Sequence, residues 1–197
     1  MAAFHLASMT RAAFDRAVVV MIALSSTIAG GASAQGTPRS EYEIKAAYLF
    51  TFGRFIEWPP HPDHDESAFT LCVLGADPFG RALDATIADG TLHGRRVAAK
   101  RIGAAKDATS CEILFISASE ERRVDSIVQS LNRAGVLTVS DIPEFVRHGG
   151  MIQFVTAENR IRFEINLASA REAGLTMSSE LLKVASAVST NSSPGSE

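Results

Sequence analysis

Polar residues that could do chemistry follow three apolar runs of the sequence. Asp77 comes soon after the run FTLCVL (69–74), Ser117 directly follows CEILFI (111–116), and Asp141 follows VLTVS (136–140). If these runs are parallel strands, their carboxyl ends are where ligands bind. Asp77, Ser117 and Asp141 are therefore the candidate ligand-binding residues. All three also suit helix caps, because Asp and Ser accept hydrogen bonds from the first free N–H groups of a helix.

No set of catalytic residues can be assembled around these positions. The stretch GADPFGRA (75–82) has two glycines at phosphate-loop spacing, but Arg81 and Ala82 stand where that loop needs Lys and Ser or Thr. Ser117 does not lie in a G-x-S-x-G elbow. We therefore predict that the protein is not an enzyme, with a hydrolase that uses Ser140 or Asp141 as the alternative.

The segment HPDHDE (61–66) holds two His and two Asp residues, which are common metal ligands. Pro60 and Pro62 prevent the regular helix that would space those ligands on one face. A solvated acidic loop explains the segment better than a metal centre. We predict neither a metal nor a cofactor.

The sequence contains two cysteines, Cys72 and Cys111. Their spacing matches neither a CxxC redox site nor a zinc pattern. Two thiols in an exported protein pair when their geometry allows, because the compartment is oxidising. We predict a disulfide, with two reduced core cysteines as the alternative.

Export is predicted by the amino terminus. Arg11 and Arg16 precede an apolar run, and Ala32-Ser33-Ala34 fits the small-x-small rule for signal peptidase. We predict a signal peptide over 1–34, cleaved after Ala34; an uncleaved anchor is the alternative. A single domain over 35–189 and a flexible tail over 190–197 would follow.

The charge of the mature chain narrows the class of partner. The whole chain has 19 Lys and Arg against 22 Asp and Glu. Without residues 1–34 these become 17 and 21, a net charge of −4. That balance argues against nucleic acid and against anionic lipid as partners, since both need a basic face.

The mature chain alternates helix and strand patterns. Such alternation predicts one α/β domain, with a mostly parallel sheet, helices on both faces and a C-terminal antiparallel hairpin. The expected helices are 41–58, 79–87, 120–132, a short one from Asp141 to Gly149, 166–173 and 179–188; the expected strands are 69–74, 95–102, 111–116, 136–139, 151–156 and 160–165.

The opening helix, EYEIKAAYLFTFGRFIEW (41–58), is apolar nearly all round. Ser40 and Glu43 form a capping box at its start, and Pro59-Pro60 should stop it. Such a helix is either covered on two sides or offered to a partner, and aromatic anchors suit interfaces. The candidate partner-binding residues, whose alternative role is core packing, are Tyr48, Phe52, Phe55, Trp58, Leu181 and Leu182.

Six stretches, in order and closely spaced, resemble the YfiR family of periplasmic proteins. They are EYEIKAAYLFTFGRFIEWP (41–59), CVLGADPFG (72–80), CEILFIS (111–117), VLTVSDIPEF (136–145), GGMIQFV (149–155) and RIRFEINLASAREAGLTMSSELL (160–182). The family carries cysteines at the positions of Cys72 and Cys111. Some members have a second pair around 145–154, which this sequence lacks, so a redox switch built on two disulfides is not implied here.

The resemblance implies a periplasmic repressor of an inner-membrane diguanylate cyclase, acting in cyclic-di-GMP and biofilm control. The partner would be the periplasmic part of that cyclase or of a sensor kinase. The protein itself would not insert into the membrane, and whether it forms a homodimer is left open. A small-ligand sensor domain acting on a sensor kinase is the alternative.

Overall fold

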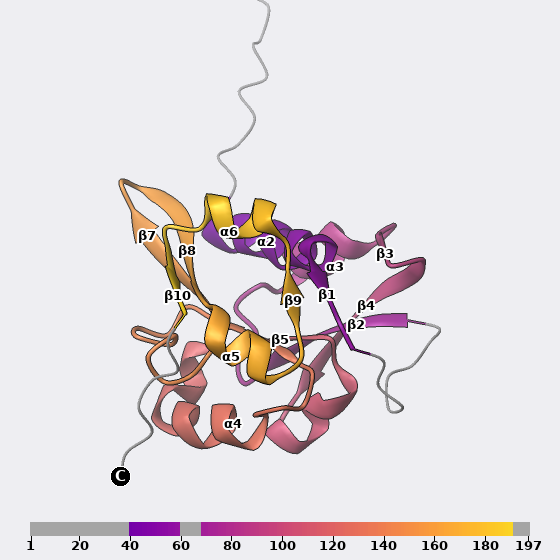
Figure 1. The fold of residues 1–197 in the computed structure, drawn as a ribbon. Coiled ribbons are helices and arrows are strands. Elements are labelled where there is room, and N and C mark those ends of the chain that lie inside the picture. Colours follow the sequence, from indigo (N-terminus) through magenta and orange to yellow (C-terminus); the bar gives the residue numbers. More distant parts are fainter. Residues whose placement is uncertain (1–39, 60–67, 191–197) are drawn as a thin grey trace, which may run out of the picture. The chain divides into compact units, whose positions relative to one another are not determined.

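An eight-stranded sheet is the framework of this protein, whose computed structural model describes residues 40–59 and 68–190 (Figure 1). The strand order is β10-β8-β7-β6-β5-β2-β4-β3. Its strands are β2 (Ala68–Leu74), β3 (Thr91–Leu92), β4 (Arg95–Ile102), β5 (Ile113–Ile116), β6 (Leu137–Ser140), β7 (Ile152–Ala157), β8 (Arg160–Asn166) and β10 (Ala187–Ser189). The predicted signal peptide, the loop 61–66 and, of the predicted tail 190–197, residues 191–197 lie outside the described residues.

Five neighbouring strands in the sheet, in the order β4-β2-β5-β6-β7, are parallel to one another. β7 and β8 form the antiparallel hairpin, while β3 is antiparallel to β4 and β10 is parallel to β8. The hairpin turns at Glu158 and Asn159, whose φ angles of 51° and 58° are those of a type I′ turn. The predicted α/β fold is confirmed.

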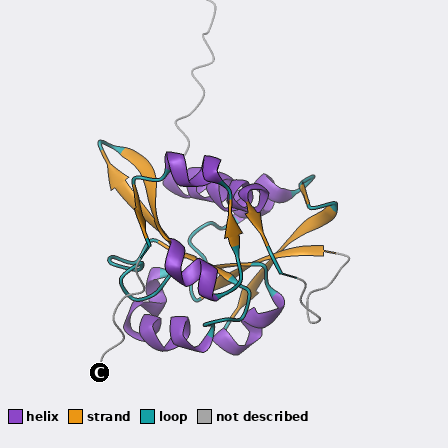
Figure 2. Cartoon of the chain, viewed as in Figure 1, coloured by secondary structure: helices purple, strands orange, loops and turns teal. Residues whose placement is uncertain are grey.

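Helices cover both faces of the sheet (Figure 2). One face packs against α2, α3, α5 and α6, and the other against η1 and α4. The bounds are α2 (Glu41–Phe55), α3 (Arg81–Ile87), η1 (Ala105–Ser110), η2 (Ala118–Arg123), α4 (Val124–Ser130), α5 (Leu167–Glu172) and α6 (Ser179–Val184). Strand alternation divides the core: Leu71 and Val73 of β2 face α2, while Cys72 and Leu74 face α4.

The opening helix starts as predicted and ends early. The Ser40 Oγ accepts a hydrogen bond from the Glu43 N–H at 3.3 Å, and the Glu43 carboxylate accepts one from the Ser40 N–H at 2.7 Å. The helix was expected to reach the proline pair but ends at Phe55. Its next residues, β1 (Ile56–Glu57), instead pair with β9 (Thr176–Met177) in a small antiparallel sheet. A tertiary partner therefore ends this helix before proline can.

Three other predicted helices differ from the structure. The first four residues of the helix expected at 120–132 lie in the 3₁₀-helix η2, so α4 is short. In the helix expected from Asp141 to Gly149, residues 143–149 form turns instead. The last helix ends at Val184, and residues 187–189 form β10. They form a strand because they pair with β8, and local sequence does not reveal that distant partner.

Candidate functional site

The carboxyl ends of β2 and β5 lie side by side, because these strands are parallel neighbours. The Asp77 carboxylate, after β2, accepts a hydrogen bond from the Phe79 N–H at 2.8 Å and lies 2.9 Å from Arg101 Nε. Ser117, after β5, is buried, and its hydroxyl accepts a hydrogen bond from the Ser119 N–H at 3.4 Å. Groups of the chain itself therefore engage both of these predicted ligand-binding residues.

The crevice between these two strand ends is filled by side chains. The chain leaves β2 toward β4 on one side and leaves β5 toward β6 on the other, which is the arrangement at which α/β sheets usually bind ligands. Gly75 has a φ of +88°, and a Cβ there would lie 2.4 Å from Ser119 Oγ and 2.9 Å from Glu120 Oε1. Ser119 Oγ also accepts a hydrogen bond from the Ala76 N–H at 2.9 Å. The loop after β5 thus packs into this crevice.

Asp141, the third predicted ligand-binding residue, anchors the opening helix. Lys45 Nζ lies 2.6 Å from Asp141 Oδ2 and 2.5 Å from Glu41 Oε1. The Tyr42 hydroxyl donates a hydrogen bond to the same Asp141 oxygen at 3.0 Å. The side chain of Lys45 is only 4% exposed and that of Asp141 12%. This buried cluster ties α2 to the carboxyl end of β6.

The cluster changes the protonation of its members. Burial by itself would lower the pKa of Lys45, but hydrogen bonds to the Asp141 and Glu41 carboxylates outweigh it, so this pKa is raised. Burial raises the pKa of Tyr42, and the negative charge of Asp141 raises it further. Lysine therefore remains charged and tyrosine neutral well into the alkaline range.

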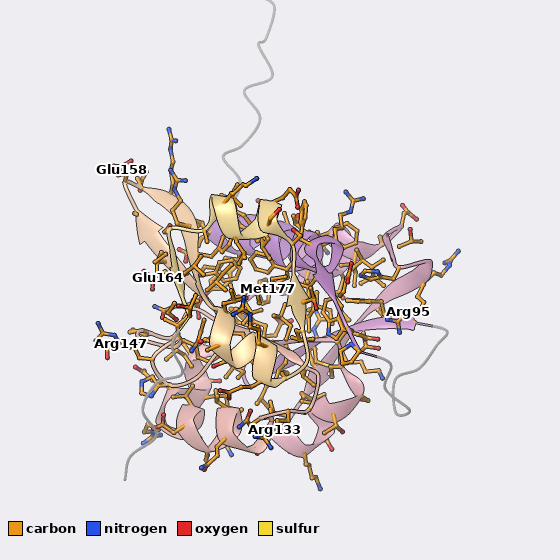
Figure 3. The ribbon with its side chains drawn as sticks, viewed as in Figure 1. Arg95, Arg133, Arg147, Glu158, Glu164 and Met177 are labelled. Carbon is orange, nitrogen blue, oxygen red and sulfur yellow. A yellow bond between two sulfur atoms is a disulfide. The ribbon has the colours of Figure 1, made fainter. Side chains whose placement is uncertain are left out.

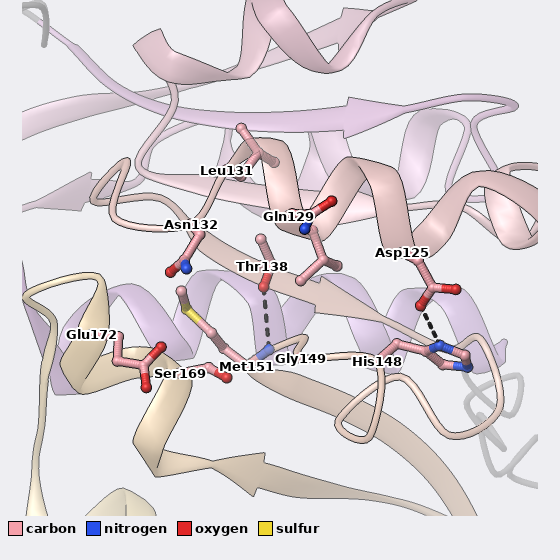
Figure 4. A pocket seen from close by; sticks show the side chains of 11 residues that line it. Asp125, Gln129, Leu131, Asn132, Thr138, His148, Gly149, Met151, Ser169 and Glu172 are labelled. Atoms are coloured by element: carbon pink, nitrogen blue, oxygen red, sulfur yellow. Dashed lines mark hydrogen bonds and ion pairs between the residues drawn. The ribbon is translucent and has the colours of Figure 1, made fainter. Parts of the chain in front are cut away.

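A polar pocket of about 440 Å³ lies between α4, the loop before β7 and α5 (Figure 4). His148 Nδ1 lies 2.5 Å from Asp125 Oδ1 at one end, and Glu172 lies at the other end in this view. The Thr138 hydroxyl, between them, accepts a hydrogen bond from the Met151 N–H at 3.1 Å. This pocket is away from the three ligand-binding residues that the sequence predicts.

A second buried polar cluster lies at the amino-terminal edge of the sheet. Glu112 is 1% exposed, and its carboxylate accepts hydrogen bonds from the Thr70 N–H and from Arg95 Nη1, both at 2.6 Å. The Trp58 Nε1–H donates to the Glu112 carbonyl at 3.0 Å, and the Trp58 ring meets Phe69 edge to face at 5.2 Å. These contacts join the end of the opening segment to β2 and β5.

The predicted disulfide is confirmed between Cys72 and Cys111, whose Cα atoms are 6.0 Å apart. Cys72 lies in β2 and Cys111 lies just before β5, so the bond joins neighbouring strands on the face that α4 covers. Both residues are fully buried. The bond therefore belongs to the core of this face.

The six predicted partner-binding residues divide between core and surface. Phe52 and Leu181 are buried in the core, at 0% and 3% exposure, so they are not available on the surface. The other four are half-buried against that core: Tyr48, Phe55, Trp58 and Leu182. The indole N–H of Trp58 is hydrogen-bonded to the Glu112 carbonyl inside the fold. The predicted contact surface is therefore reduced to Tyr48 and Phe55 of α2 and Leu182 of α6.

The two large apolar side chains that the described residues leave exposed lie at the end of the fold. Val184, the last residue of α6, is 62% exposed, and Val188 in β10 is 38% exposed. By contrast Met177 lies among core side chains in Figure 3, while Glu158 and Arg147 project outward. The exposed apolar surface therefore lies on the same closing segment as Leu182.

A shallow groove runs between α2 and the tip of the β7–β8 hairpin. Ile44 and Tyr48 line it from the helix, and Ile161 lines it from β8. Glu41 and Arg160 add one charge of each sign. Tyr48 therefore belongs both to this groove and to the half-buried side chains of α2.

Residues 40–59 and 68–190 contain no group of three or more His, Cys, Asp or Glu placed to hold a metal. In the same ranges, every helix is too short or too polar to cross a membrane.

Sequence reasoning missed Lys45, Tyr42 and the β10 edge. A lysine in a largely apolar helix is a signal for a buried ion pair, but its partner Asp141 is 96 residues away. The sequence predicted Val184 and Val188 in one helix, but in the structure Val184 ends α6, Val188 pairs with β8, and both are exposed.

Two solved structures are similar to part of this chain. A conserved domain protein from Vibrio cholerae O1 biovar eltor is 12% identical, with a TM-score of 0.46 over 61% of this chain and 54% of its own. The ABC domain in complex with L-Trp from Streptococcus pneumonia is 12% identical, with a TM-score of 0.52 over 73% of this chain and 60% of its own. This chain thus matches less than two thirds of either structure. At 12% identity, the similarity to the Streptococcus structure shows a related fold alone.

The family match extends across nearly the whole described fold. The model of the family described as YfiR/HmsC-like matches residues 42–186. That range begins in α2 and ends directly before β10, so it includes the buried Lys45–Asp141 pair, the disulfide and α6. Because the match spans well over half of the sequence, the chain belongs to the YfiR/HmsC-like family.

Proposed function

We propose that this chain is a periplasmic regulatory protein that binds and represses an inner-membrane signalling partner, a diguanylate cyclase. It acts by binding and not as an enzyme. Membership of the YfiR/HmsC-like family supports this role. The Cys72–Cys111 disulfide fits an oxidising compartment. Repression of the cyclase would keep cyclic-di-GMP low and restrain biofilm formation.

The observation that carries a binding role is the apolar surface of α2 and α6. α6 packs against α2; Tyr48, Phe55 and Leu182 on these helices are half-buried, and Val184 at the end of α6 is exposed. A repressor must bind one state of its partner more tightly than the other. Apolar and aromatic anchors at the centre of an interface supply most of such binding energy.

The test of this function is the cyclic-di-GMP concentration in cells without the gene. We expect deletion to raise cyclic-di-GMP and surface attachment, and the wild-type gene supplied in trans to restore both. An unchanged concentration, in a strain whose cyclases are intact, would contradict the proposal.

A charged variant tests the surface. Val184→Glu places a carboxylate in the proposed contact at little cost to folding, because residue 184 is 62% exposed. We expect it to fail in restoring repression although it is exported and folded. The matched control is Thr109→Glu, an exposed position in η1 on the opposite face of the sheet, which should repress like the wild type.

The polar pocket between α4 and α5 favours a second role, as a sensor of a small polar ligand acting on a sensor kinase. Asp125, Asn132 and His148 line it, and its volume of about 440 Å³ suits a metabolite. A thermal-shift screen of polar metabolites should then find one that raises the melting temperature of the wild type but not of Asn132→Leu. A screen without a stabilising compound would remove this role.

A further inference from the structure

The two edges of the eight-stranded sheet differ in chemistry. At one edge the two-residue β3 covers only the start of β4, and the rest of β4 carries the exposed cations Lys100 and Arg101. Charged side chains on an edge strand deter pairing with another chain. At the other edge β10 has none, and residues 185–190 (ASAVST) contain no charge at all. Only the first edge therefore has the usual protection.

The hydrogen-bond pattern of β8 shows which β10 groups face outward. The Asn166 N–H donates to the Met151 carbonyl on the β7 side, so the neighbouring Ile165 directs its backbone groups toward β10. In a parallel ladder a residue bonds to the two residues that flank its opposite number. Ile165 lies opposite Val188. Its partners are therefore the flanking Ala187 and Ser189, and the N–H and C=O of Val188 point away from the sheet.

The side chains around this backbone pair are apolar and accessible. Val188 is 38% exposed, and Val184, four residues earlier at the end of α6, is 62% exposed. Among the described strands, none lies beyond β10 in the sheet. An outward N–H and C=O beside exposed valines form a site that a strand can complete, because an extended chain supplies both a matching backbone and an apolar side chain.

We propose that the β10 edge is where the partner docks, by adding an extended, uncharged segment of its own as a further strand beside Val188. This rests on the proposed function, which supplies a partner protein, and it states the form of the contact. Backbone pairing at Val188 fixes the position of the segment. Contact with Val184 and with Leu182 of α6 adds the apolar part of the interface.

A partner protein is favoured over a second copy of this chain by the length of the strand. β10 has three residues, whereas a stable interface buries about 800 Å² on each side. A two-fold contact between two such strands would gain only the few hydrogen bonds around Val188. A different protein can add further contacts with α6 and with the half-buried side chains of α2. Pairing of two β10 strands does not by itself bring those surfaces together.

The first experiment measures amide hydrogen exchange in the isolated protein by NMR. We expect fast exchange at Val188 and slower exchange at Ala187 and Ser189. A capped pentapeptide of alternating threonine and valine, added as a probe strand, should shift the Val188 amide resonance and slow its exchange. Protection of Val188 before the peptide is added, or no shift with it, would overturn the proposal without bearing on repression.

The second experiment replaces one backbone donor. Val188→Pro removes the outward N–H and leaves the donors to β8 in place, as proline at a strand edge allows. Val188→Thr keeps both the N–H and the branched shape. In the deletion strain we expect Val188→Thr to restore low cyclic-di-GMP and Val188→Pro to leave it at the deletion level, with equal melting temperatures and periplasmic amounts.

The outcomes separate the two proposals. If deletion raises cyclic-di-GMP and Val188→Pro still represses fully, the docking edge is wrong and the repressor role stands. If deletion has no effect but the peptide binds at Val188, the edge stands and the repressor role fails. A dimer of the wild type in light scattering, absent in Val188→Pro, would assign the edge to a second copy and overturn docking of a partner.

Discussion

At the scale of single residues, Lys45 and Asp141 form a buried ion pair. They join the opening helix to the end of β6 at 2.6 Å with almost no exposure. Removal of one member of a buried ion pair costs far more than removal of an exposed one, because the remaining charge stays desolvated. Glu41 also contacts Lys45, so some compensation remains after Asp141 is lost.

We expect Asp141→Asn to lower the free energy of unfolding by about 3 kcal/mol. The matched control is Asp84→Asn, which removes a partner of Arg101 at 2.7 Å in an exposed ion pair and should cost less than about 1 kcal/mol. Urea unfolding of both variants at neutral pH measures the difference. Equal losses of unfolding free energy in the two variants would show that burial does not determine how much the Lys45–Asp141 pair stabilises the fold.

The same cluster predicts a stability limit at high pH. Both Lys45 and Tyr42 have pKa values raised above 10.5 and 10.0, so the folded state holds these protons more tightly than the unfolded state. Their contribution is complete below about pH 10 and is lost as the pH rises through the folded-state values. Urea midpoints between pH 9 and pH 11.5 should fall, and should fall less steeply for Lys45→Met with Tyr42→Phe. Parallel curves would contradict this assignment.

At the scale of elements, the disulfide joins β2 to the start of β5 across 39 residues of sequence. Closing a loop of that length restricts the unfolded chain. The bond also lies within a core that would form without it, since β2 and β5 pair directly. It should therefore affect stability much more than fold.

Replacement of both cysteines by alanine should lower the free energy of unfolding by about 4 kcal/mol. Circular dichroism of the double variant should keep the wild-type shape, and urea unfolding gives the loss. Labelling of the denatured, unreduced wild type should find almost no free thiol. Two reactive thiols in each chain would show that the bond does not form in the cell.

At the scale of the whole molecule, location and function depend on export. Residues 1–34 lie outside the described part of the chain, so the signal peptide stays a prediction from Arg11, Arg16 and Ala32-Ser33-Ala34. The net charge of −4 for the rest fits a protein whose partner is another protein.

We expect the protein recovered from a periplasmic fraction to begin at Gln35, because signal peptidase cleaves after small-x-small sequences. Amino-terminal sequencing and intact mass measure this directly. Ala34→Arg, which spoils the cleavage position, should leave the longer form attached to membranes. A periplasmic protein that still begins at Met1 would disprove the cleavage.

Family membership and the α/β class could both be predicted from sequence, because strand runs such as CEILFI (111–116) and the capping box at Ser40 are local signals. The early end of α2 could not, since β1 needs β9 more than 100 residues later. Nor could β10, whose residues 187–189 form a strand only beside β8. For the same reason, the three predicted ligand-binding residues proved to be engaged by Arg101, Ser119 and Lys45.

The sequence by itself predicted the main strands of the sheet in their order, a pairing of the two cysteines and the family, because periodicity, composition and motif order are properties of neighbouring residues. Only the tertiary structure decided which apolar side chains are exposed. Phe52 is buried and Val184 exposed although both are apolar residues of helices, because exposure depends on what packs against a residue from elsewhere in the chain. The proposed contact surface therefore lost Phe52 and Leu181 and gained Val184 and Val188 of the closing segment.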